Sequence, residues 1–166
     1  MNEKETIKRL KEKFNQFEAF WEGKEWWGAI KSLSYLYNCI DTQINSIQIR
    51  KDWMDKLVKP TFTKEICDNV ENGYLKMYRQ ITKILSVGDR FNDDEFLLLM
   101  TYHTTLSLVL EYLNLNGVKC PIVDLKGVER EIIEFGKLKK NRNDFNSSIS
   151  QMRKNGIPVN IIWHQL

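Results

Sequence analysis

The stretch EWWGAIKSLSYLYNCIDTQINSIQIRKDWMDKLV, residues 25–58, decides the predicted fold. Apolar and aromatic side chains recur in it mostly three and four residues apart, at Trp26, Ile30, Leu33, Tyr37, Ile40, Ile44, Ile47, Met54 and Val58. Residues at that spacing share one face of an α-helix, and no proline precedes Pro60. We therefore expect one central helix, roughly 50 Å long at the usual rise per residue. Its apolar stripe must be covered by other helices.

The remaining segments repeat the helical pattern. Further helices are predicted over residues 4–22, 64–87, 93–115 and 124–154, with a break in the last one between Leu138 and Phe145. The apolar tail, residues 157–166, is expected to dock on the bundle as an extended segment or to meet a partner. The sequence thus predicts an all-α fold. It is one domain over residues 1–166, an antiparallel bundle of about five helices with one long central helix and an extended apolar C-terminal tail.

Composition is that of a soluble globular protein. The chain has 166 residues, 42% hydrophobic and 28% charged, and its net charge of +3 neither demands nor excludes nucleic acid. The charged N-terminus does not resemble a signal peptide. The apolar run over residues 96–110 is shorter than the roughly 20 residues of a membrane span. We expect a cytoplasmic protein that does not enter a membrane, with the cationic residues of the first helix on a solvated face. These are Lys4, Lys8, Arg9, Lys11 and Lys13.

Motifs of known chemistry are scarce. Cys39, Cys67 and Cys120 lie far apart, which favours reduced thiols in a cytosolic protein over disulfides or a metal site. His103 lies in the most apolar predicted helix, where it is either a hydrogen-bonded core residue or a catalytic base. His164 has no acidic neighbour in sequence. The acidic residues 93–95 suit a helix start better than a metal site. We predict no metal and no cofactor, and a non-enzyme is favoured over an enzyme.

Aromatic residues gather at the corner between the first two predicted helices. Phe20, Trp21, Trp26 and Trp27 either plug the end of the bundle or form a partner-binding or base-stacking site. Trp26, Trp27 and Trp163, the last in the apolar tail, are the candidate partner-binding residues.

One basic segment resembles a known family. Residues 137–147 read KLKKNRNDFNS. This segment resembles the signature of HEPN domains, all-helical bundles found in bacterial toxins, defence systems and CRISPR-associated ribonucleases. That signature is an Arg, often followed by Asn, with a His a few residues on, near the start of a late helix. Arg142 and Asn143 match its first two positions, and Ser147 stands where the His would be.

The resemblance implies a degenerate member that binds RNA, dimerises or inhibits a partner without cutting. Arg142 would contact phosphate and Asn143 would orient it. Independently of the family, the local positive charge can neutralise phosphates, or it can favour the end of the preceding helix. The candidate nucleic-acid-binding residues are Lys137, Lys139, Lys140, Arg142 and Asn143.

Three functions follow from these observations. The first is a non-enzymatic helical interaction module that binds a protein partner or a second copy of the chain, in a bacterial or phage defence-type complex. The second is a HEPN-like RNA-binding domain that uses the segment around Arg142. The third is an active ribonuclease with His103 or His164 as an unorthodox base.

Overall fold

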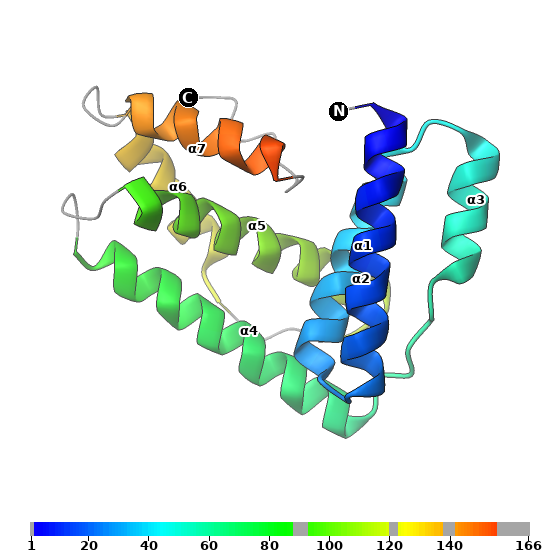
Figure 1. The fold of residues 1–166 in the computed structure, drawn as a ribbon. Coiled ribbons are helices and arrows are strands. Elements are labelled where there is room, and N and C mark those ends of the chain that lie inside the picture. The colour runs from blue at the N-terminus through cyan, green and yellow to red at the C-terminus, as the bar shows by residue number, and fades with distance from the viewer. Residues whose placement is uncertain (1, 88–92, 120–122, 138–141, 156–166) are drawn as a thin grey trace. The chain divides into compact units, whose positions relative to one another are not determined.

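Every regular element of the structure is an α-helix. The structure, a computed structural model, describes residues 2–87, 93–119, 123–137 and 142–155, and within these ranges it contains no strand. The helices are α1 (Glu3–Glu22), α2 (Trp26–Gln43), α3 (Ile47–Lys56), α4 (Lys64–Leu85), α5 (Asp93–Leu115), α6 (Leu125–Lys137) and α7 (Arg142–Lys154) (Figure 1). The predicted all-α class is confirmed, and the starts and ends of α1, α4 and α5 fall close to their predicted positions.

The chain divides into two compact units. Unit 1 comprises Met1–Tyr74 and Leu108–Cys120, and unit 2 comprises Leu75–Ser107 and Pro121–Leu166. The helices α4 and α5 each begin in one unit and end in the other. Each unit has its own set of buried side chains. One domain over residues 1–166 stays a prediction.

The single long helix predicted over residues 25–58 is wrong. The helix α2 ends at Gln43, Ile44 has extended backbone angles, and the hydroxyl of Ser46 accepts the N–H of Ile49 to begin α3. The guanidinium of Arg50 then donates to the carbonyls of Asp41 and Ile44, which the end of α2 leaves without helical partners. Local capping therefore outweighs a continuous apolar stripe. Because residues 124–154 also divide, into α6 and α7, the described residues hold seven helices instead of about five.

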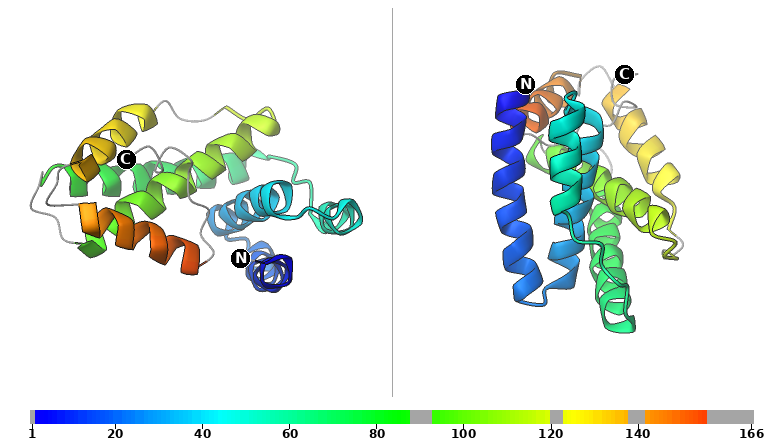
Figure 2. Two further views of the ribbon diagram at one scale, coloured as in Figure 1. Left: turned by 90° about the horizontal axis from the view of Figure 1, so that it is seen from above. Right: turned by 90° about the vertical axis from the view of Figure 1, so that its right-hand side faces the viewer.

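The α1–α2 hairpin of unit 1 turns through an unusual residue. The two helices lie side by side and antiparallel in each view (Figures 1 and 2). At the turn, Lys24 has a φ of 57°. Its N–H donates to the carbonyl of Trp21, and the N–H of Glu25 donates to that of Phe20. These two bonds form a Schellman motif, in which glycine usually takes the left-handed position. Here Gly23 precedes that position and has a φ of −78°.

The N-terminus of α2 is held by α4, which also lies in unit 1 up to Tyr74. No side chain preceding α2 caps it, and instead the side-chain oxygen of Asn69 accepts the N–H of Trp27 at 3.0 Å. Four residues further along α4, Gly73 lies so close to the ring of Trp27 that a Cβ there would overlap it. The indole therefore sits directly on the α4 backbone. A glycine inside the helix, unfavourable by propensity, permits this approach.

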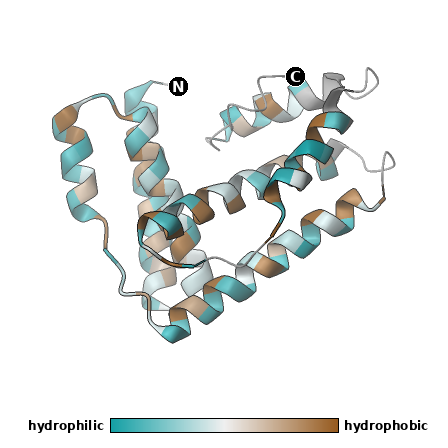
Figure 3. Ribbon diagram, turned by 180° about the vertical axis from the view of Figure 1, so that it is seen from behind, coloured by the Kyte–Doolittle hydropathy of each residue, from teal (hydrophilic) through white to brown (hydrophobic). Residues whose placement is uncertain are grey.

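The core of unit 1 follows the predicted faces of its helices. Ile30, Leu33, Ile40 and Ile44 from the quoted stripe are fully or almost fully buried, whereas Ile47 at the start of α3 is 86% exposed. In Figure 3 the N-terminal end of α3 is correspondingly brown on an otherwise mostly hydrophilic helix. The other buried apolar side chains of this unit are Leu10, Phe17, Ala29, Leu36, Cys39, Trp53, Ile66, Val70, Tyr74, Val109, Tyr112 and Leu113.

Unit 2 contains α4 from Leu75 onward, α5 up to Ser107, and α6 and α7. Its buried apolar side chains are Ile81, Phe96, Leu99, Met100, Leu106, Val128, Ile132, Ile149 and Met152. The predicted break between Leu138 and Phe145 is confirmed, because α6 ends at Lys137 and α7 begins at Arg142. The predicted extended tail, residues 157–166, lies outside the described residues.

Within the described ranges, one helix meets the length and composition of a membrane span. It is Asp94–Leu115, and half of it is buried inside the protein. The core helix of a soluble protein has the same properties. The helix extends beyond the apolar run over residues 96–110, so the expectation that this segment is too short to span a membrane does not hold, and its role as a buried core helix stays a prediction.

Candidate functional site

Of the segment over residues 137–147, the structure describes Lys137 and residues 142–147, at the end of α6 and in α7. Lys137 is the last residue of α6, and Arg142 and Asn143 are the first two of α7. Lys139 and Lys140 lie outside the described residues. Ser147, in the position of the family's His, is exposed and lies about 140° around the helix axis from Arg142. The buried face of α7 is formed instead by Ser148, Ile149 and Met152.

The aromatic residues at the corner between α1 and α2 pack against one another in unit 1. The rings of Trp21 and Trp26 meet edge to face at 5.3 Å between centroids, and Trp21 continues the row to Phe17 at 5.8 Å. Both Trp26 and Trp27 are half-buried. This is the packing expected if the cluster plugs the end of the bundle. Partner binding by Trp26 and Trp27 stays a prediction, and Trp163 lies outside the described residues.

His103 is a buried residue that joins α5 to α6 within unit 2. It is 1% exposed, and its Nε2 lies 3.3 Å from the carbonyl oxygen of Leu125 and 3.4 Å from Oε2 of Glu129. Both neighbours are acceptors, so Nε2 must carry a hydrogen. Burial lowers the pKa of His103, partly opposed by the hydrogen bond to Leu125. Burial also raises the pKa of Glu129.

The lowered pKa of His103 and the raised pKa of Glu129 fit a hydrogen bond between the two side chains better than an ion pair. A carboxylate near an imidazolium normally raises the pKa of the histidine and lowers its own. Here desolvation is the larger effect on each group, so the neutral imidazole is favoured. A neutral imidazole that is buried and donates through Nε2 fixes the first turn of α6 against α5. This geometry is that of a core histidine.

A seam of cationic and aromatic side chains between α1 and α2 was missed by the sequence reasoning. Lys4, Lys8 and Lys11 are exposed as predicted, but Arg9 and Lys13 are half-buried. The ammonium of Lys13 lies over the ring of Tyr35, 4.8 Å from its centroid. Lys31 precedes Tyr35 by four residues on α2. Its ammonium lies 5.6 Å from the ring centroid of Trp27.

The charges of this seam influence one another. Burial lowers the pKa of Lys13, and the nearby charge of Lys31 lowers it further. Burial also lowers the pKa of Lys31. Burial raises the pKa of Tyr35 to about 12, and the positive charge of Arg9 opposes that shift. The four-residue spacings Arg9–Lys13 and Trp27–Lys31–Tyr35 were the signal in the sequence, because each set shares one helix face.

The two described thiols, Cys39 and Cys67, are not joined in a disulfide. Cys39 is buried and Cys67 is half-buried, and both are free thiols. Burial raises the pKa of Cys39 to about 11, which keeps it protonated and unreactive. Among the described residues, no three His, Cys, Asp or Glu side chains lie together in a way that could hold a metal ion.

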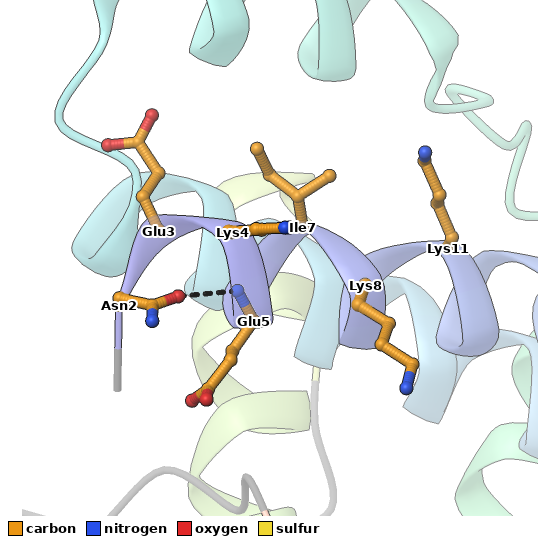
Figure 4. Close-up of a pocket in the computed structure, with 7 residues that line it drawn as sticks. All are labelled: Asn2, Glu3, Lys4, Glu5, Ile7, Lys8 and Lys11. Atoms are coloured by element: carbon orange, nitrogen blue, oxygen red, sulfur yellow. Dashed lines mark hydrogen bonds between the residues drawn. The ribbon is translucent and has the colours of Figure 1, made fainter.

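A shallow hollow of about 760 Å³ lies over the first turns of α1 and is lined by Asn2, Glu3, Lys4, Glu5, Ile7, Lys8 and Lys11. Its side chains point in different directions around the helix (Figure 4). The side chain of Asn2 is used to cap α1, accepting the N–H of Glu5 at 2.8 Å. The hollow therefore has no set of polar groups that converges on a ligand.

Comparison with known proteins returns no relative. No protein-family model, no curated protein sequence and no solved structure matches this chain.

Proposed function

We propose that this chain is a non-enzymatic helical interaction module that binds a protein partner, in a bacterial or phage complex of the defence type. The observation that carries the proposal is the exposed isoleucine of α3. Ile47 is 86% exposed on a helix whose position is fixed from two sides. The ring of Trp53 meets Phe14 of α1 at 6.1 Å, and Arg50 bonds to the end of α2.

A fixed helix lowers the cost of binding. An apolar side chain on an ordered element loses little conformational entropy when a partner covers it. Apolar residues in the centre of an interface contribute most of the binding energy when they fill a pocket of the partner. The buried position of His103 also favours binding over catalysis, because a general base must reach its substrate.

The test is affinity capture from native lysate with wild-type protein and Ile47→Asp. Val87→Asp is the matched control, because Val87 is also an exposed apolar residue, 37% exposed, but lies in unit 2. We expect a defined complex with wild type and Val87→Asp and its loss with Ile47→Asp. Solution mass of the purified chain separates a second copy from a different partner. Equal recovery with both variants would refute the proposal.

The second candidate function is RNA binding through the basic segment around Arg142. What supports it is the helix boundary, since α7 begins at Arg142 and the HEPN-like signature belongs near the start of a late helix. The test is binding of a labelled single-stranded RNA over a range of salt concentrations. Replacing Lys140 and Arg142 by alanine should reduce the slope of log K against log salt by about 1.4, for two phosphate contacts. An unchanged slope would exclude this segment.

A further inference from the structure

We propose that the seam between α1 and α2 that contains Arg9, Lys13 and Lys31 binds a compact phosphate-bearing anion of the pyrophosphate class. The inference is independent of the protein-binding function proposed above. Cationic side chains of α1 and α2 come together at this seam. The helices are antiparallel, so Lys13 of α1 reaches the ring of Tyr35 on α2. Lys31 precedes Tyr35 by one turn of α2, and Arg9 precedes Lys13 by one turn of α1, so that its charge also acts on Tyr35.

The arrangement is unfavourable without an anion. Two ammonium groups repel each other and have lost part of their hydration, and burial and proximity lower the pKa of Lys13. Within the described part of the chain, no carboxylate forms an ion pair with Lys13 or Lys31. The rings of Tyr35 and Trp27 supply only the weaker attraction between a cation and an aromatic face. A bound anion would remove the repulsion.

The number and position of the charges indicate the class of ligand. Lysine is a compact point charge that suits phosphate oxygens, and an anion with two adjacent phosphates offers one charged group for the lysine of each helix. The lysines are half-buried in a seam between two packed helices, which suits a small anion. Each of the two rings already has a lysine over one face, which disfavours their use as stacking platforms for the bases of a nucleic acid.

The experiment measures binding of inorganic pyrophosphate to the full chain by calorimetry at constant ionic strength. Lys13→Gln and Lys31→Gln should each weaken binding by about tenfold or more, as expected for loss of a charge-assisted contact. Lys13→Arg should retain most of it. Lys11→Gln is the matched control, because Lys11 lies on α1 near Lys13 but is exposed, and it should bind as wild type does.

A second readout separates an anion site from a purely structural role. Without anion, Lys13→Gln should raise the melting temperature or leave it unchanged, because it removes a repulsion. Pyrophosphate should raise the melting temperature of wild type and not that of Lys13→Gln. Three results would overturn the proposal. These are no binding at millimolar pyrophosphate, equal loss in Lys11→Gln, or binding of oligouridylate at this seam without binding of pyrophosphate.

Discussion

Lys24 is the residue whose replacement should stabilise unit 1 most simply. It has a φ of 57°, a region that costs a residue with a Cβ roughly 1–2 kcal/mol. Its side chain is exposed, so it contributes little packing. The turn itself is fixed by two hydrogen bonds, Lys24 to Trp21 at 3.2 Å and Glu25 to Phe20 at 2.9 Å. Neither bond involves the side chain of Lys24.

Lys24→Gly should therefore increase the free energy of unfolding. Glycine removes the roughly 1–2 kcal/mol of left-handed strain. It also lowers stability by about 0.4–1 kcal/mol, because it increases the conformational entropy of the unfolded chain. The net gain is about 0.5–1 kcal/mol, which corresponds to roughly 1–4 °C in melting temperature for a chain of this size. Urea unfolding followed by far-ultraviolet circular dichroism measures it. Lys24→Ala is the control, because alanine keeps the Cβ and should gain nothing from relief of strain.

The end of α5 provides the reverse experiment. Gly117 has a φ of 68° with open space around it, and the N–H groups of Gly117 and Val118 donate to Asn114 and Leu113 in the same motif. Gly117→Ala introduces strain without a clash and should cost about 1 kcal/mol. Backbone strain at Lys24 is refuted if Lys24→Gly is no more stable than wild type, or if Lys24→Ala is stabilised equally.

Three further outcomes are expected. Gly73→Ala should destabilise by about 1–3 kcal/mol in urea unfolding, despite the better helix propensity of alanine, because its Cβ would overlap the ring of Trp27; a gain in stability would contradict this packing. Ile40→Asp should leave the chain unfolded or aggregated on size-exclusion chromatography, because Ile40 is 0% exposed and an isolated buried charge is very unfavourable; a normal melting curve would refute it. Burial lowers the pKa of His103 below its ordinary 6.5, so folding favours the neutral ring. Stability is then fully present above about pH 6.5 and is lost as the pH falls from there through the lowered pKa. Urea unfolding between pH 8 and 5.5 should show this loss of stability in wild type and a smaller loss in His103→Gln. Both proteins keep Glu129. Identical pH profiles of stability would exclude His103 as the source of the loss.

Periodicity predicted the helices but not all of their ends. The seams of α1 and α4 are regular and α5 is apolar on nearly every side, and these three helices lie where the sequence pattern placed them. The stripe over residues 25–58 is equally regular, yet the chain leaves the helical conformation at Ile44. The reason is local chemistry that periodicity does not measure. A serine cap begins α3 at Ser46, and the guanidinium of Arg50 satisfies the end of α2.

The candidate sites depended on contacts between segments far apart in sequence. A break between Leu138 and Phe145 could be predicted, because a polar run interrupts the seam there, and α7 begins at Arg142 within that range. The seam of Lys13 and Lys31 could not be predicted from either helix alone, because it requires the antiparallel pairing of α1 and α2. The same holds for Trp27, whose backbone N–H is bound by Asn69, 42 residues further along the chain. A hydrophobic pattern identifies buried faces but does not show which polar groups meet between them.

The environment of His103 also restricts the enzymatic alternative. A ribonuclease base must offer an unprotonated ring nitrogen to a substrate hydroxyl. The Nε2 of His103 carries a hydrogen directed at the acceptors of Leu125 and Glu129, so Nδ1 is the unprotonated nitrogen of the neutral ring. Nδ1 is buried, and the residue is 1% exposed. A substrate could reach this ring only if the contacts between α5 and α6 were broken. Between the two histidines, we therefore expect any RNA cleavage by this chain to depend on His164. Comparing His164→Ala with His103→Gln tests each histidine separately. Activity that survives His164→Ala and is lost in a folded His103→Gln would show that α6 opens, and it would contradict the structural role assigned to His103.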